Sequence, residues 1–162
     1  MSEQENAAQG EQPQQQFALQ KIYLKDLSFE TPNSPAIFTE QWEPSINVEL
    51  QTAGSEVGEN VHDVVLTVTV TAKLGDKIAY LVEVQQAGVF TVAGFNEQER
   101  GHMLGSYCPG ILFPYAREAI SDLVAKGGFP QMLLGPVNFD AMYAEHLQRQ
   151  QQPQGDGEAA VH

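Results

Sequence analysis

Residues 105–118 read GSYCPGILFPYARE, and this run decides how the second half of the chain folds. Large apolar side chains stand around Pro109 and Pro114, and a helical spacing of apolar residues follows them. Proline fixes φ and removes a backbone donor, so each of the two is expected to start, kink or stop a helix. The run predicts a broken entry into a long helix. It holds no set of residues for covalent chemistry and points to a protein that works through surface and assembly.

Two helices are predicted after this point. Residues 111–126 place apolar side chains on one side and charged ones on the other, and Gly127-Gly128 is a natural C-terminal stop. Asn138 can cap a last helix. Its apolar stripe follows the i, i+3, i+4, i+7, i+8 spacing and comprises Phe139, Met142, Tyr143, His146 and Leu147.

The first half of the chain reads as strands. Residues 46–51 and 64–72 alternate apolar and polar side chains, which is the period of a half-buried strand. Residues 73–76 form a predicted tight turn, and residues 78–92 are predicted as the strand that returns from it. Residues 17–27 are a further candidate strand.

Between these strands, residues 28–44 carry three prolines and are predicted as a long irregular crossover. The strands together predict an antiparallel meander. Because strands come first and helices afterwards, we expect an α+β domain. Its predicted form is a four-stranded antiparallel sheet with a long helix and a C-terminal helix on one face.

The chain has 162 residues, which favours one domain, and we place it at residues 17–147. Residues 1–16 and 148–162 are rich in Gln, Glu and Gly. Such segments bury too little apolar surface to offset the entropy of ordering, so both ends are predicted to be disordered.

The formal net charge is −13, and residues 26–72 contain acidic side chains but no Lys or Arg. A strongly negative field repels nucleic-acid phosphates and anionic lipids and attracts basic partners. A solvated face is the usual interpretation of such a run, and a docking surface for a cationic partner is the sharper one.

Cys108 is the only cysteine, so no intramolecular disulfide can form, which suits a reducing compartment. The N-terminus lacks the basic and apolar regions of a signal peptide, and no apolar run approaches the length of a membrane span. We therefore expect a cytoplasmic protein.

The search for chemistry finds no phosphate-binding glycine loop and no metal-ligand spacing among the four histidines. Cys108 reads as a small buried hydrophobe and the histidines as packed or solvated side chains. We expect no enzyme, no cofactor and no metal. Trp42 in the crossover either plugs the core or forms the aromatic wall of a groove, so a small-ligand protein or enzyme using a Trp42 groove is the alternative.

Residues 80–86 are apolar on both faces apart from Glu83 and the glutamines. One face must meet the helices, and the other is exposed in a monomer unless another subunit covers it. This pattern predicts oligomerisation.

Several strings carry a resemblance to a known family. They are IYLKDLSFE at 22–30, VVLTVTVTA at 64–72, EVQQ at 83–86, YCP with ILFPYARE within 107–118, FPQ at 129–131 and PVNFDA at 136–141. The chain resembles the SecB family of protein-export chaperones over nearly all of the segment 17–147.

The resemblance implies a homotetramer, built as a dimer of dimers, that binds unfolded precursor proteins without ATP and delivers them to the SecA translocase ATPase. It implies a SecA-docking surface formed by Asp26, Glu30, Leu81 and Glu83. It implies tetramer packing at Tyr80, Val82, Val84 and Gln86. It implies a client groove between crossover and last helix lined by Trp42, Ile46, Val48, Leu50, Phe139, Met142, Tyr143 and Leu147. A chaperone of the same fold acting on a toxin–antitoxin pair is a third interpretation.

Overall fold

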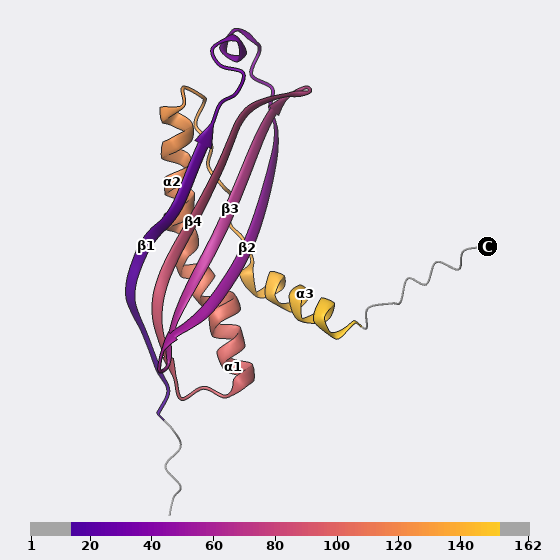
Figure 1. The fold of residues 1–162 in the computed structure, drawn as a ribbon. Helices are drawn as coiled ribbons and strands as arrows, with labels where there is room; N and C mark the ends of the chain where they lie inside the picture. The colour runs from indigo at the N-terminus through magenta and orange to yellow at the C-terminus, as the bar shows by residue number, and fades with distance from the viewer. Residues whose placement is uncertain (1–13, 153–162) are drawn as a thin grey trace, which may run out of the picture.

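The four strands of the sheet are all antiparallel, as predicted, in a computed structural model that describes residues 14–152. They are β1 (Gln16–Glu30), β2 (Ser45–Gly58), β3 (Val61–Leu74) and β4 (Lys77–Ala93). Their order across the sheet is β1-β4-β3-β2 (Figure 1). The predicted meander is therefore wrong for β1, which pairs with β4 and not with β2. Only β2, β3 and β4 form a meander.

The crossover explains this order, because residues 31–44 carry the chain from one edge of the sheet to the other. This segment is less irregular than predicted and contains a short helix, η1 (Ala36–Thr39). It is fastened to the start of β4 at two points. Lys77 Nζ lies 2.7 Å from Glu40 Oε1, and Asn33 Nδ2 donates to the Ile78 carbonyl at 2.9 Å.

The strands extend beyond their predicted limits. β1 runs to Glu30, and β2 continues to Gly58 before a turn in which Asn60 has φ of 57°. The second half of β2 is exposed on both faces, so its sequence lacks the alternation on which the prediction relied. The turn after β3 is confirmed, and Gly75 occupies it with φ of 60°, a conformation that favours glycine.

The helical layer begins earlier than predicted. α1 (Glu97–His102), the π-helical segment η2 (Met103–Tyr107) and α2 (Cys108–Lys126) follow one another without a break. Asn96 and Glu99 form a capping box that starts α1. The two prolines do not stop the helix. Pro109 lies in the first turn of α2, where its missing N–H is tolerated, and Pro114 lies inside it, so the irregular backbone is η2, upstream of both prolines.

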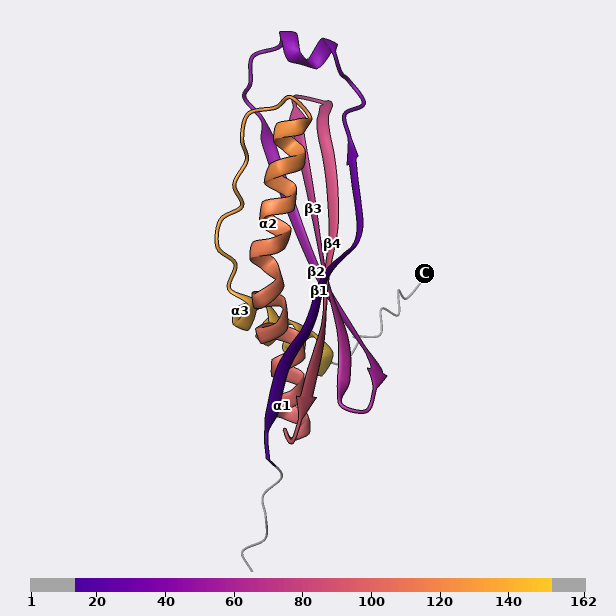
Figure 2. The same ribbon diagram turned by 90° about the vertical axis from the view of Figure 1, so that its left-hand side faces the viewer.

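α2 covers one face of the sheet, as Figure 2 shows edge-on. Its buried side chains Leu112, Ala116, Ile120 and Val124 repeat with helical spacing and meet the apolar side chains of β3 and β4. The predicted stop is confirmed, because α2 ends at Lys126 and Gly128 has φ of 88°.

The chain then returns along α2 in an extended segment to α3 (Phe139–Gln151), which projects sideways from the helical layer (Figures 1 and 2). The predicted cap is confirmed, since Asn138 accepts a hydrogen bond from the Ala141 amide. α3 extends past the predicted limit at Leu147, so residues 148–151 are helical and not disordered. The predictions for residues 1–13 and 153–162 lie outside the described residues. No helix between residues 14 and 152 is long and apolar enough to cross a membrane.

Candidate functional site

The face of the sheet opposite the helices carries the four residues predicted to dock SecA. Glu30 pairs with Leu81, and Asp26 pairs with Gln85, two residues from Glu83 on the same face. The alternation of β4 turns Leu81 and Glu83 outward and half exposes them, while their neighbours on either side are buried. The Thr69 hydroxyl donates to Glu83 Oε1 at 2.8 Å and fixes that carboxylate. The structure therefore brings Asp26, Glu30, Leu81 and Glu83 together on one helix-free surface, which we call the acidic face.

The residues predicted for tetramer packing lie on the other side of β4. Tyr80, Val82 and Val84 are fully buried in the core of a single chain, and Gln86 is 5% exposed. The Gln86 side chain donates to the Tyr23 carbonyl at 3.0 Å. Within one chain these residues belong to the buried core and do not form part of the outer surface.

Trp42 belongs to an aromatic cluster at the crossover end of the sheet. Its ring stacks on Tyr80 at 6.3 Å and lies 5.5 Å from Phe129, which in turn lies 5.1 Å from Phe38. Trp42 is partly buried against the core, which matches the core-plug interpretation of this residue. The aromatic cluster is formed by crossover, β4 and the segment after α2, and α3 contributes nothing to it.

The predicted groove residues therefore lie in separate regions of the structure. Leu50, Phe139, Met142 and Tyr143 line one cavity of about 560 Å³ between β2 and α3, which we call the α3 cleft. The same cleft is rimmed by polar and charged side chains of α3, among them Glu145, His146 and Arg149. β2 is an edge strand, so this cleft adjoins backbone groups that no strand within residues 14–152 pairs with.

Ile46 and Val48 connect the two regions. Both pair with buried β3 residues, so they share the helix-facing side, yet they are 40% and 39% exposed. Leu147 is separate from the α3 cleft and lines a neighbouring cavity of about 680 Å³ with Phe95 and Met103. The eight predicted residues thus form a discontinuous apolar strip from Trp42 to α3, and not one closed groove.

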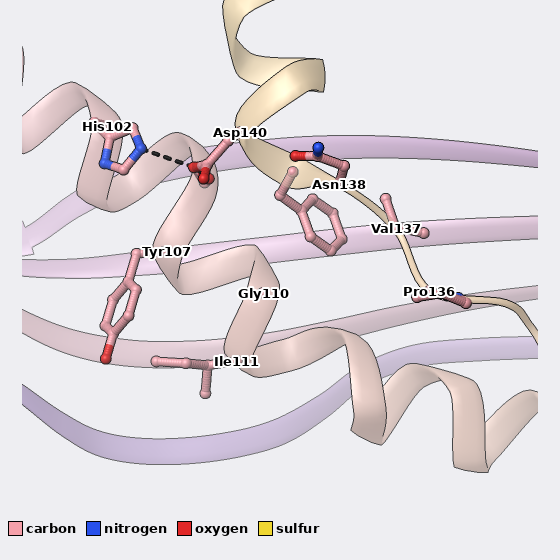
Figure 3. Close-up of a pocket in the computed structure, with 10 residues that line it drawn as sticks. His102, Tyr107, Gly110, Ile111, Pro136, Val137, Asn138 and Asp140 are labelled. Atoms are coloured by element: carbon pink, nitrogen blue, oxygen red, sulfur yellow. Dashed lines mark hydrogen bonds and ion pairs between the residues drawn. The ribbon is translucent and has the colours of Figure 1, made fainter.

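A polar cluster that the sequence analysis did not single out lies at the base of α3. Asp140 Oδ1 lies 2.8 Å from His102 Nε2 and accepts a hydrogen bond from the Ser106 hydroxyl. Figure 3 shows the His102–Asp140 contact beside a cavity of about 760 Å³ lined by η2, the start of α2 and residues 136–140. The hydrogen bonds from Ser106 and His102 lower the pKa of the Asp140 carboxyl below its ordinary value.

This cluster was missed because the long helix was predicted to start at Ile111. His102 and Ser106 are four residues apart, so on a helix that starts at Glu97 they share one face. A prediction that had carried the helix through Gly101 and Gly105 would have aligned them.

Cys108 is fully buried, as predicted for a small hydrophobe, and burial raises the pKa of its thiol to about 12. Over residues 14–152, no three His, Cys, Asp or Glu side chains gather closely enough to hold a metal ion.

The family model for the preprotein translocase subunit SecB matches residues 10–150. Protein-export protein SecB of Methylococcus capsulatus is 60% identical over 89% of this chain and 93% of its own length, and that of Nitrosococcus oceani is 59% identical over 98% and 94%. The SecB of Ectopseudomonas mendocina is 52% identical over the whole of both chains.

Among solved structures, a SecB-like chaperone of Mycobacterium tuberculosis in complex with an antitoxin peptide has the same fold. It superposes with a TM-score of 0.62 at 15% identity, covering 75% of this chain and 90% of its own. The α+β fold with its two helical elements is thus a SecB-like fold. Since the family model and the identical residues span nearly the whole chain, the protein belongs to the SecB family of protein-export chaperones.

Proposed function

We propose that this chaperone binds unfolded precursor proteins without ATP and delivers them to the SecA translocase ATPase in the cytoplasm. One observation carries the proposal, namely that the α3 cleft, which contains apolar side chains, and the acidic face lie on different parts of one sheet. A client in the cleft therefore leaves the acidic face free, so holding and delivery can occur at the same time.

The α3 cleft suits an extended client. Leu50, Met142 and Tyr143 offer apolar contacts, and the edge of β2 offers unpaired backbone groups. Met142 adapts its shape to different side chains, which favours promiscuous binding. The exposed Ile46 and Val48 extend this surface toward the Trp42 cluster. Because the client is bound preferentially in its unfolded state, its folding is delayed by mass action without any chemical step or enzymatic activity.

The acidic face suits a basic partner. Glu30 lies opposite the half-exposed Leu81, Glu83 follows it two residues along the same face, and Asp26 lies farther along β1, so the surface combines a negative field with an apolar contact. Opposite charges speed the encounter of two proteins and fix their orientation. We infer that SecA docks here.

We further propose a homotetramer arranged as a dimer of dimers. Tyr107 and Tyr115 are each 50% exposed on the long helix, which is a large aromatic surface for a monomer to leave in water. A tetramer brings several α3 clefts to one client, so weak contacts add up to firm binding.

Client holding is tested by diluting a denatured precursor into the chaperone without ATP and following aggregation by light scattering. We expect the chaperone to suppress aggregation of the precursor when the two are present in stoichiometric amounts. The double variant Leu50→Gln, Met142→Gln should lose most of it, whereas Leu133→Gln, at an apolar side chain 70% exposed outside the cleft, should keep it. If both variants lose suppression of aggregation equally, the α3 cleft is not the client-binding site.

SecA docking is tested with the double reversal Asp26→Lys, Glu83→Lys. We expect SecA affinity to fall on the order of tenfold while client holding is unchanged. The matched control Glu56→Lys, Glu59→Lys changes net charge equally at the β2–β3 hairpin. If both pairs weaken SecA alike, net charge and not the acidic face is responsible.

A further inference from the structure

α3 is attached to the rest of the chain at its first half. It packs mainly against η2, and the side chains that make this contact come from its first turns. The Phe139 ring meets the Phe113 ring at 5.7 Å, and Tyr143 lies over Gly101 and Gly105. From Ala144 to Gln151 every α3 residue is exposed. The position of α3, and with it the width of the α3 cleft, therefore depends on a few contacts near its N-terminus.

Asp140 is the polar centre of that attachment. Its carboxylate contacts both His102 and Ser106, which lie one helical turn apart on the long helix. It also lies in the first turn of α3, where a negative charge complements the helix dipole. The His102 ring meets the Tyr143 ring edge-on at 5.9 Å, so this imidazole contacts two residues of α3 one turn apart.

We propose that Asp140, His102 and Ser106 form a proton-sensitive anchor that holds α3 on the long helix and thereby sets the width of the α3 cleft. The inference rests on the proposed function in one respect only, which is that clients occupy this cleft. We call these three residues the α3 anchor. They are positioning residues, because they act on the client through α3.

The α3 anchor is sensitive to protons because it contains a histidine, His102. A neutral imidazole has one N–H to donate, and a protonated one has two and carries a positive charge, a change that histidines undergo between about pH 5 and 8. Asp140 stays ionised through this range, because its partners lower the pKa of its carboxyl. Protonation therefore turns a hydrogen bond into an ion pair and tightens the anchor.

The other titratable groups around His102 do not reverse this sign. Those lining the same two cavities are Glu99 of α1, Tyr107 of η2, and Asp140 and Tyr143 of α3. Glu99 accepts hydrogen bonds from the Asn96 amide and from the Gln15 side chain. Asp140 is therefore the carboxylate that contacts His102.

The direct test is amide hydrogen exchange of α3 in the full-length protein from pH 8 to pH 5.5, expressed as protection relative to the unstructured chain. An exposed ion pair changes the equilibrium constant for local opening of a helix such as α3 by about two- to fivefold. We expect α3 protection to rise by that factor on acidification in the wild type and to stay flat in His102→Gln. Ser106→Ala should lower protection at every pH while leaving the pH dependence in place.

Glu145→Gln is the matched control, because it removes one negative charge from α3 at a side chain paired only with Arg149. Asp140→Asn should lower α3 protection more than Glu145→Gln does. Equal effects of the two variants, or a His102→Gln profile as steep as the wild type, would overturn the anchor.

Client binding is then measured across the same pH range with a permanently unfolded peptide. The client dissociation rate should vary with pH in the wild type and not in His102→Gln. If α3 protection behaves as expected but client dissociation does not follow it, the anchor stands and the assignment of clients to the α3 cleft fails. If α3 protection has the same pH dependence in the wild type and in His102→Gln, the anchor is wrong regardless of the client dissociation rate.

Discussion

Tyr143 of α3 lies directly over Gly105 of the long helix, so that a Cβ at Gly105 would come within 2.5 Å of the tyrosine ring. The aromatic ring fills a notch that exists only because the π segment η2 carries a glycine here. The contact joins the element that lines the proposed client cleft to the helix that covers the sheet.

The substitution Gly105→Ala should therefore displace α3. The methyl group would overlap the ring and destabilise the attachment by about 1–3 kcal/mol, which hydrogen exchange of α3 would detect as lost protection. Gly110→Ala is the control, because a Cβ there meets no atom within 4 Å and an alanine in an exposed helix stabilises by about 0.5–1 kcal/mol. Unchanged α3 protection in Gly105→Ala would show that Tyr143 does not set the position of α3.

Val84→Phe should overpack the core beneath α2. Val84 is fully buried, so the larger ring costs about 1–3 kcal/mol of unfolding free energy, measurable by urea denaturation. We also expect the proposed tetramer to dissociate toward dimers in light scattering, because the shifted helix carries the exposed Tyr107 and Tyr115. The neighbouring Glu83→Gln on the acidic face is the control and should change neither quantity. If Val84→Phe remains fully tetrameric, packing at this core position does not affect subunit assembly.

Cys108 should be inert in the native protein. Its thiol is fully buried, and the pKa of about 12 leaves almost no thiolate at pH 8, which is the reactive form. A colorimetric thiol reagent should react slowly in buffer and at once in urea. Rapid labelling under native conditions would mean that the helical layer opens locally around Cys108.

Asp140→Asn should lower stability at neutral pH and not in strong acid. Because the pKa of Asp140 is depressed in the folded state, its ionised form stabilises the fold above the ordinary carboxyl pKa. This contribution disappears as the pH falls through the depressed value. Urea unfolding from pH 7 to pH 2 should therefore show two curves that converge at the acid end. In Ser106→Ala the convergence should be complete at a higher pH, because the largest cause of the depression is removed.

The elements that the sequence predicted well are those with one buried face. β3 and the last two-thirds of the long helix show clean periodicity because Leu66, Val68, Ile120 and Val124 all face the core. The residues of the acidic face came from the family resemblance and not from periodicity. The alternation around Leu81 and Glu83 turns both to the side opposite Val82 and Val84.

What escaped prediction depends on contacts that are distant in the sequence. The exposed half of β2 follows from pairing with β3, and the place of β1 follows from its pairing with β4. The long helix was predicted to start only at Ile111, so Gly101 and Gly105, which receive Tyr143, were left outside it. The residues predicted for the client groove came from the resemblance, and the separation of Trp42 from the α3 cleft depends on where the crossover ends.

The strand order also has a consequence for synthesis of this protein. Gln16 pairs with Ala93 and Glu30 with Leu81, so the first strand to leave the ribosome has no partner until the last strand has emerged. Pairing so distant in the chain is slow, and an exposed strand edge is prone to associate with other chains during the delay. During its own synthesis this chaperone therefore resembles an unfolded client, because its sheet is incomplete and its apolar side chains are not yet buried.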